Sequence, residues 1–71
     1  MTAIDYVKGL RELGFGVSVP KSEQGLPLGV QVTFPDRMPK GEDHDRWMRL
    51  ESWCRSEGSP RAIADAVEAL A

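Results

Sequence analysis

The spacing of hydrophobic residues changes from helical to extended and back to helical along the chain, and it predicts the secondary structure. Apolar residues first recur three or four positions apart, which predicts a helix from Ala3 to Leu13. The apolar stripe of this helix consists of Ile4, Tyr6, Val7, Leu10 and Leu13. Gly9 inside the helix is either a tolerated residue or a position where another element packs closely.

Both ends of this helix carry capping residues. Thr2 is a suitable N-cap, and Asp5 three positions later can complete a weak form of the capping box, in which Glu or Gln is preferred. Gly14 fits the left-handed position that follows many helices. Phe15 would then contact Leu10 in a Schellman arrangement, so we expect the helix to stop sharply here.

The hydrophobic period then shortens to two residues, which predicts two half-buried strands. Apolar residues alternate with polar or small ones over residues 15–19 and again over residues 30–34. Pro20 and Pro35 end these strands, and the segment KSEQGLPLG between them favours antiparallel pairing through a long loop. Each strand of a two-stranded sheet keeps one unpaired edge, which is a template for a strand from another chain.

Two further helices are predicted after the second strand and its loop. The first runs from His44 to Glu57, with Asp43 as its N-cap and Gly58 after its end. Ser59 is a suitable N-cap for the second helix, and Pro60 occupies the first helical position, where proline is preferred. The buried positions of this last helix are Ile63, Ala66, Val67 and Leu70.

The order α-β-β-α-α predicts a single small α+β domain over residues 1–71, with a two-stranded antiparallel hairpin packed on helices. Hydrophobic residues make up 41% of the chain and charged residues 28%, which is typical of a globular protein. A domain of 71 residues has one modest core, so docking or a homodimer would add useful burial.

The net charge and the cysteine content indicate which partners and which cellular compartment are expected. The net charge of −2 disfavours a general attraction to nucleic acid or to a membrane surface. The single cysteine excludes an internal disulfide, and the opening segment MTAIDYVKGLREL lacks the basic and apolar regions of a signal peptide. No apolar run approaches the ~18 residues that span a bilayer. We therefore expect a cytoplasmic protein.

His44 and Cys54 are the two residues whose side chains could bind a metal ion or act in nucleophilic catalysis. Structural zinc needs four convergent Cys or His ligands, and this chain has only these two. Ten positions on one helix separate them by about 15 Å along its axis, too far for a nucleophile and its base. Cys54 is better interpreted as a small buried residue. We expect no enzymatic activity, no metal and no cofactor.

Basic residues cluster in the second half of the chain, at Arg37, Lys40, Arg46, Arg49 and Arg55. Three of them follow an acidic residue by four positions, which favours ion pairs along the helix surface. These pairs are Glu42 with Arg46, Asp45 with Arg49, and Glu51 with Arg55. A helix face whose basic residues are paired with carboxylates is typical of a solvent-exposed surface. The last helix is also not basic enough for a DNA-recognition helix. We therefore expect no direct nucleic-acid binding.

One face of the predicted helix 44–57 carries bulky residues. Trp47, Leu50 and Cys54 share this face, Trp53 lies toward its edge, and Met48 points away from Trp47. Two interpretations stay open. Either both tryptophans belong to the only core, or Trp53 and Met48 are exposed and form part of an interface.

The opening MTAIDYVKGLRELGFGVSV resembles the start of the TubC-type N-terminal docking domains of polyketide and nonribosomal peptide synthetases. The α-β-β-α-α order extends this likeness over most of the chain, whereas a longer hairpin loop, the segment PDRMPKGED, Trp47 and Trp53 depart from the family pattern. The resemblance implies that the hairpin captures a short segment of a partner protein by strand addition. Related domains are similar to segments of phage and mobile-element proteins.

These observations predict a non-catalytic protein-protein interaction module of the docking type. Val30, Val32 and Phe34 are expected to face the first and third of the predicted helices. The predicted partner-binding residues are Gln31, Thr33, Arg37, Met48 and Trp53. The alternative is a phage or mobile-element inhibitor of the anti-CRISPR kind, which would occlude a nucleic-acid-binding site on a host protein.

Overall fold

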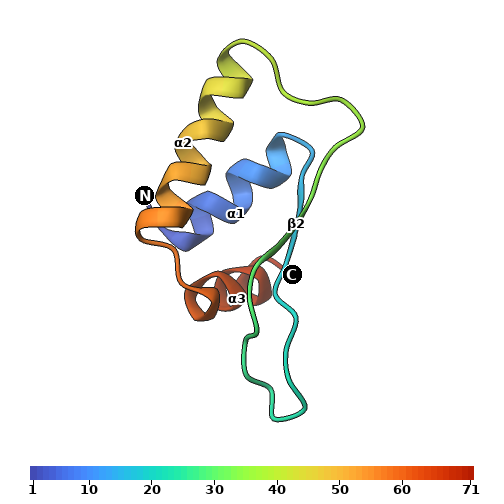
Figure 1. Cartoon of the computed structure of the whole chain (residues 1–71), viewed down its shortest axis with the longest axis vertical. Helices are drawn as coiled ribbons and strands as arrows, with labels where there is room; N and C mark the ends of the chain where they lie inside the picture. Colours follow the sequence, from blue (N-terminus) through green and yellow to red (C-terminus); the bar gives the residue numbers. More distant parts are fainter.

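Helix α1 lies at the centre of the fold, and the other elements are arranged around it (Figure 1). The computed structural model describes all residues from 1 to 71. Its elements are α1 (Ala3–Glu12), β1 (Gly16–Ser18), β2 (Gln31–Thr33), α2 (Glu42–Ser56) and α3 (Pro60–Ala69). The helices α2 and α3 pack against α1 and not along each other. The predicted order and the small α+β class are confirmed.

The predicted caps of α1 are present at both ends. The Thr2 hydroxyl accepts a hydrogen bond from the Asp5 backbone N–H at 3.2 Å, and the Asp5 carboxylate accepts one from the Thr2 N–H at 3.1 Å. At the other end Gly14 has φ of 93°. The Gly14 N–H donates to the Arg11 carbonyl and the Phe15 N–H donates to the Leu10 carbonyl, each at 3.0 Å, which completes the Schellman motif.

The hydrophobic core forms between α1 and the elements around it. The buried residues in this cluster are Tyr6, Val7, Leu10, Phe15, Val17, Leu50, Ile63 and Ala66. One predicted core position of α1 is wrong, because Ile4 remains 42% exposed. Ile4 borders a shallow groove whose α3 side is lined by small residues such as Ala62, Ala66 and Ala69, and these side chains are too short to cover it.

Gly9 marks the place where α2 approaches α1 most closely. A Cβ atom on Gly9 would lie 3.0 Å from Cδ1 of Leu50, closer than ordinary van der Waals contact. The absence of a side chain at Gly9 therefore lets Leu50 enter the core, where it is buried. Of the two interpretations of Gly9, the structure supports close packing.

The start of α2 differs from the prediction, whereas Gly58 follows the C-cap residue Glu57, as predicted. The helix begins at Glu42, and its N-cap is Gly41, with φ of 61° and no side-chain capping bond. Asp43 is therefore not the N-cap; it lies in the first turn, where a carboxylate interacts favourably with the positive end of the helix dipole. Gly58 is needed for space, since a Cβ there would lie 2.8 Å from the Cys54 carbonyl oxygen.

The two strands pair antiparallel, as predicted, but each contains only three residues. Val17 lies opposite Val32 at the middle of the pair. The connection of residues 19–30, which we call the hairpin arm, extends beyond α3 (Figure 1). Near its base Lys21 forms an isolated bridge with Pro27, and its ammonium group contacts the Glu68 carboxylate of α3 at 2.8 Å. This exposed ion pair joins the arm to α3, while Val19 and Val30 at the two ends of the arm pack against the core.

Helix α3 starts as the sequence predicts. The Ser59 hydroxyl accepts a hydrogen bond from the Ala62 N–H at 3.1 Å, and Pro60 occupies the first turn. Ile63, Ala64 and Ala66 are buried, whereas the predicted core residues Val67 and Leu70 are half-buried. None of the three helices is long and apolar enough to cross a bilayer.

We predict that Leu50→Ala lowers the free energy of unfolding by about 2–5 kcal/mol, because it removes a buried side chain where α2 meets α1. Urea unfolding followed by circular dichroism measures the change. Met48→Ala on the same helix is the control, and we expect its effect to be much smaller because Met48 is 38% exposed. Equal effects would contradict the assigned face of α2.

We predict that Ser59→Ala costs about 0.5–2 kcal/mol, because the Ala62 N–H loses its hydrogen-bond acceptor. The urea midpoint should fall accordingly. Ser52→Ala is a matched control within α2, where the Ser52 side chain makes no hydrogen bond and alanine favours the helix. A midpoint that is unchanged in Ser59→Ala would mean that α3 does not depend on this cap.

Candidate functional site

Strand β2 lies at the outer side of the sheet with its far edge unpaired. β1 pairs with β2 and packs against α1 and α3, whereas no helix runs alongside β2. The backbone of residues 31–33 makes no hydrogen bond outside the pairing with β1. Because alternate residues of a strand direct their N–H and C=O groups to opposite edges, β2 presents free donors and acceptors on its outer side.

The side chains of this region follow the predicted alternation only in part. Gln31 and Thr33 are exposed, and Val30 and Val32 are half-buried against the core. Phe34 lies on the same side of the strand as Val32, but the prediction that the first and third helices cover it is wrong: its ring meets Phe15 and Trp47 of α2, and its side chain is 63% exposed. Strand β2 ends at Thr33, and Phe34 lies at the periphery of the core with much of its ring uncovered.

Phe34 belongs to an aromatic cluster that runs from the core to the surface. Its ring meets Phe15 edge-on at 5.8 Å and Trp47 edge-on at 6.1 Å. Trp47 stacks on Phe15 at 5.3 Å and meets His44 edge-on at 5.8 Å. The Trp47 indole Nε1 is buried and has no hydrogen-bond acceptor. The exposed Phe34 ring is therefore held in place by the core residue Phe15 and by α2.

Met48 lies on the flank of α2 that also carries His44, four positions earlier and therefore one turn away. His44 contacts Trp47, which in turn contacts Phe34, so this flank of α2 borders the aromatic cluster. Met48 lies about 100° around the helix from Trp47 and is 38% exposed, so its binding role stays a prediction. We refer to Gln31, Thr33, Phe34 and Trp47 as the β2 surface. It combines an unpaired strand edge with large apolar side chains.

The structure does not bring Trp53 to the β2 surface. Six residues separate Trp53 from Trp47, which corresponds to about 120° around the helix. The Trp53 ring packs on Tyr6 of α1, with ring centroids 5.4 Å apart, and it is half-buried. Trp47 is half-buried as well, but it packs on Phe15. The two tryptophans therefore lie on opposite flanks of the buried face of α2. A binding role for Trp53 remains a prediction, alongside the structural role that its contact with Tyr6 shows.

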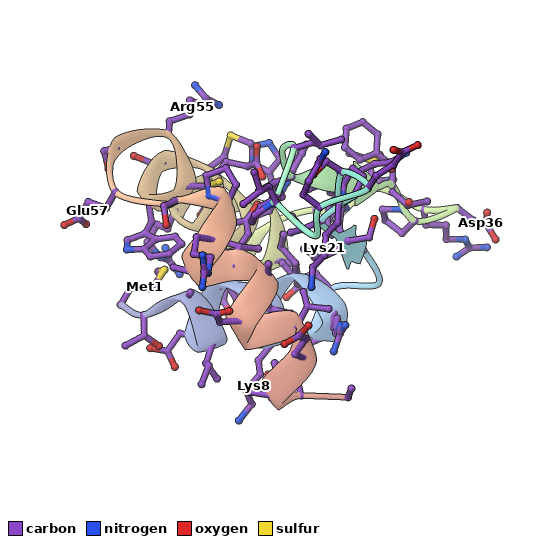
Figure 2. The ribbon with its side chains drawn as sticks, turned by 90° about the horizontal axis from the view of Figure 1, so that it is seen from below. Met1, Lys8, Lys21, Asp36, Arg55 and Glu57 are labelled. Carbon is purple, nitrogen blue, oxygen red and sulfur yellow. The ribbon has the colours of Figure 1, made fainter.

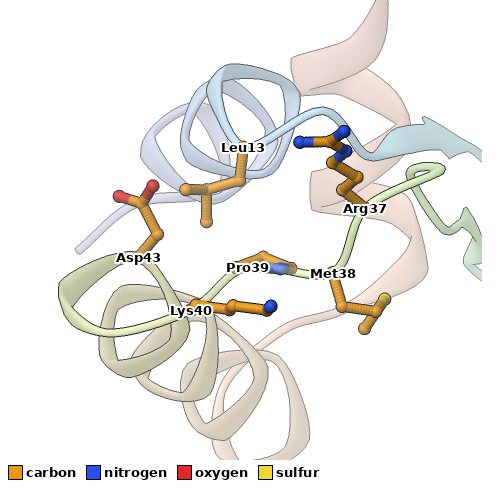
Figure 3. Close-up of a pocket in the computed structure, with 6 residues that line it drawn as sticks. All are labelled: Leu13, Arg37, Met38, Pro39, Lys40 and Asp43. Carbon is orange, nitrogen blue, oxygen red and sulfur yellow. The ribbon is translucent and has the colours of Figure 1, made fainter.

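Arg37 lies in the loop between β2 and α2, at one side of an open hollow (Figure 3). The residues around this hollow are Leu13, Arg37, Met38, Pro39, Lys40 and Asp43. Two cationic side chains and a carboxylate line it together, and Arg37 and Lys40 form no ion pair. This mixed charge favours neither an anion nor a cation as a ligand.

The predicted ion pairs along α2 do not form. Arg46 instead contacts Glu12 of α1 at 3.3 Å, because it lies on the flank of α2 that faces α1. Arg49 and Arg55 have no carboxylate within ion-pair distance. Figure 2 shows Arg55, Glu57, Lys8 and Asp36 pointing away from the body of the molecule. Charged side chains of both signs thus surround the fold without forming one basic or acidic face.

The groups that could support catalysis do not converge. No cluster of three or more His, Cys, Asp or Glu side chains could hold a metal ion. Cys54 is half-buried next to Tyr6. Burial, a hydrogen bond with the Cys54 side chain and the nearby charges of Cys54 and Glu51 raise the pKa of Tyr6 well above its usual value. A hydrogen bond from Lys21 lowers the pKa of Glu68.

The sequence predicts some residues of the β2 surface but not all of them. The alternation of residues 30–34 identified the strand and its outward residues Gln31 and Thr33. The exposure of Phe34 was missed, although Pro35 immediately after it signals the end of pairing. Comparison of the chain with protein-family models, with curated proteins and with solved structures finds no match.

We predict that alkaline pH destabilises the protein through Tyr6. The pKa of Tyr6 is raised in the folded state, so the neutral phenol stabilises the fold below the ordinary tyrosine pKa of 10.0, and this contribution is lost as pH rises above that value. Because Tyr6 is the only tyrosine, absorbance at the phenolate band follows its ionisation directly. Chemical unfolding above pH 10 should show a steeper loss of stability in the wild type than in Tyr6→Phe. Equal slopes would contradict this role.

Proposed function

We propose that the chain is a small protein-protein interaction module that captures an extended segment of another protein at the outer edge of β2. The observation that carries this proposal is the unpaired edge of β2 beside the exposed ring of Phe34. Strand addition satisfies the free backbone groups of such an edge and gives affinity without dependence on sequence.

Specificity would come from the side chains on the two faces of the added strand. Residues of the captured segment that point toward the helices would pack beside Val32 and Phe34, and near Trp47 on α2. Residues that point outward would lie beside Gln31 and Thr33. Because residues 30–34 carry no charge, the favoured segment has apolar residues at alternate positions and few charges.

Phe34 has the character of an anchor for such a segment. It is 63% exposed in the free chain, and its ring is already held against Phe15 and Trp47. A partner that covers it buries apolar area while ordering little that is flexible, which is how aromatic hot spots contribute to binding. The resemblance of the opening segment to TubC-type docking domains leads to the same proposed function.

Selection from a displayed library of random peptides, with the folded chain as bait, tests this proposal. We expect enriched peptides with apolar residues at alternate positions. We predict that Phe34→Ala weakens their binding about 30-fold or more, as loss of an interface hot spot does. Calorimetry measures the affinities, and backbone amide exchange should show new protection of residues 30–34 when peptide is bound.

Leu28→Ala is the matched control, because Leu28 is a large apolar residue with a similar exposure of 67% but lies on the hairpin arm. Its affinity for the peptides should stay within twofold of the wild type. Both substitutions remove exposed side chains, so the fold should be retained in each. Peptides that bind both variants equally, or that protect only α2 and α3, would overturn the proposal.

A further inference from the structure

The chain exposes more surface than a compact monomer of its mass. Its accessible area is 4845 Å², against about 4,400 Å² expected for a folded monomer of 7.9 kDa. Its radius of gyration is 12.1 Å, against about 11 Å for a compact domain of this length. The exposed large apolar residues include Phe34 at the β2 surface, as well as Leu26 and Leu28 on the hairpin arm. A second chain bound at the β2 surface would reduce the accessible apolar area of the protein.

Strand β2 lacks most of the features that prevent edge strands from pairing with one another. Such features include a charged side chain, a proline or a bulge in the strand, or a covering helix or loop. Residues 30–34 contain no charged residue and no proline, and β2 pairs with β1 without a bulge. Its shortness is the one protective feature, so self-pairing through this edge depends on protein concentration.

We propose that a second copy of this chain occupies the β2 edge, with the two β2 strands antiparallel across a two-fold axis at Val32. In this register Val32 lies opposite Val32 of the second copy, Gln31 lies opposite Thr33, and Phe34 lies opposite Val30. The two sheets would join into one sheet of four strands.

The sequence of β2 is self-complementary in this register. On the helix-facing side, Val30, Val32 and Phe34 of one copy meet the same three apolar residues of the other, so the exposed Phe34 ring gains an apolar neighbour. On the outward side the Gln31 amide meets a Thr33 hydroxyl, with which it can form a hydrogen bond. No charged residue opposes another of like sign over residues 30–34.

The neighbouring symmetric registers are less favourable. An axis at Thr33 would place Gln31 opposite Pro35 and Val30 opposite the charged residue Asp36. An axis at Gln31 would place Gly29 opposite Thr33 and leave Phe34 beyond the paired residues. Moving the axis by one residue in either direction therefore loses an apolar side-chain contact, and Val32 is the centre that pairs all of residues 30–34 with one another.

Pairing between two copies would also regulate the module. If the same edge captures a partner segment, as proposed above, a dimer and a captured segment exclude each other. This consequence depends on the proposed function, whereas the dimer itself does not. At high concentration the protein would protect its own strand edge, and the partner segment would separate the two copies.

Sedimentation velocity over a range of concentrations tests the second copy and its register. Two double variants are compared: Gln31→Lys with Thr33→Lys, and Gln31→Glu with Thr33→Lys. Because residue 31 opposes residue 33 of the other copy, the first variant places like charges opposite each other twice, and the second places opposite charges together twice. We expect the wild type to dimerise reversibly, with dimerisation weakened in the first variant and strengthened in the second, by about tenfold between them.

A control for net charge is the pair Glu23→Gln with Gln24→Lys, which changes the charge as much as the double lysine variant but at the exposed tip of the hairpin arm. Its dimerisation should match the wild type. A wild type that stays monomeric at millimolar concentration, or a dimer that responds equally to both double variants, overturns the proposal. Peptide capture that depends on Phe34 in a strictly monomeric protein would overturn the second copy alone and leave the proposed function intact.

Discussion

The structure depends on the burial of one face of α1, formed by Tyr6, Val7 and Leu10, against which α2, α3 and β1 all pack. These side chains are fully enclosed only because three other elements cover them. The helices α2 and α3 do not pack along each other, so contact with α1 is what holds them in one domain. Gly9 lets α2 come close enough for Leu50 to enter the same core.

This central position of α1 explains why the sheet keeps an open side. β1 lies against α1 and α3, and β2 can only pair on the outer edge of β1. None of the three helices packs on β2. The unpaired edge is thus a consequence of how a small core is built around one helix, and binding can use it without disturbing that core.

The aromatic cluster connects this open edge to the interior. Phe15 is buried in the core, Trp47 stacks on it, and Phe34 rests on both while its ring remains exposed. Rigid aromatic side chains lose little conformational freedom when a partner covers them. An extended segment or a second copy would therefore meet a surface whose apolar part is already positioned.

The sequence by itself determined the features whose causes lie within a few residues of one another. Thr2, Ser59 and Gly14 could be placed at helix ends because a cap needs only a side chain or a backbone angle beside the turn that it completes. The periods of 3.6 and 2 likewise predicted three helices, two strands and their order. Tertiary structure decided whatever depends on distant neighbours. Arg46 pairs with Glu12, thirty-four positions away, and not with Glu42 on its own helix, because packing turns that flank of α2 toward α1. Phe34 continues an apolar alternation yet remains exposed, because an alternating pattern specifies the side of the strand but not whether another element covers that side.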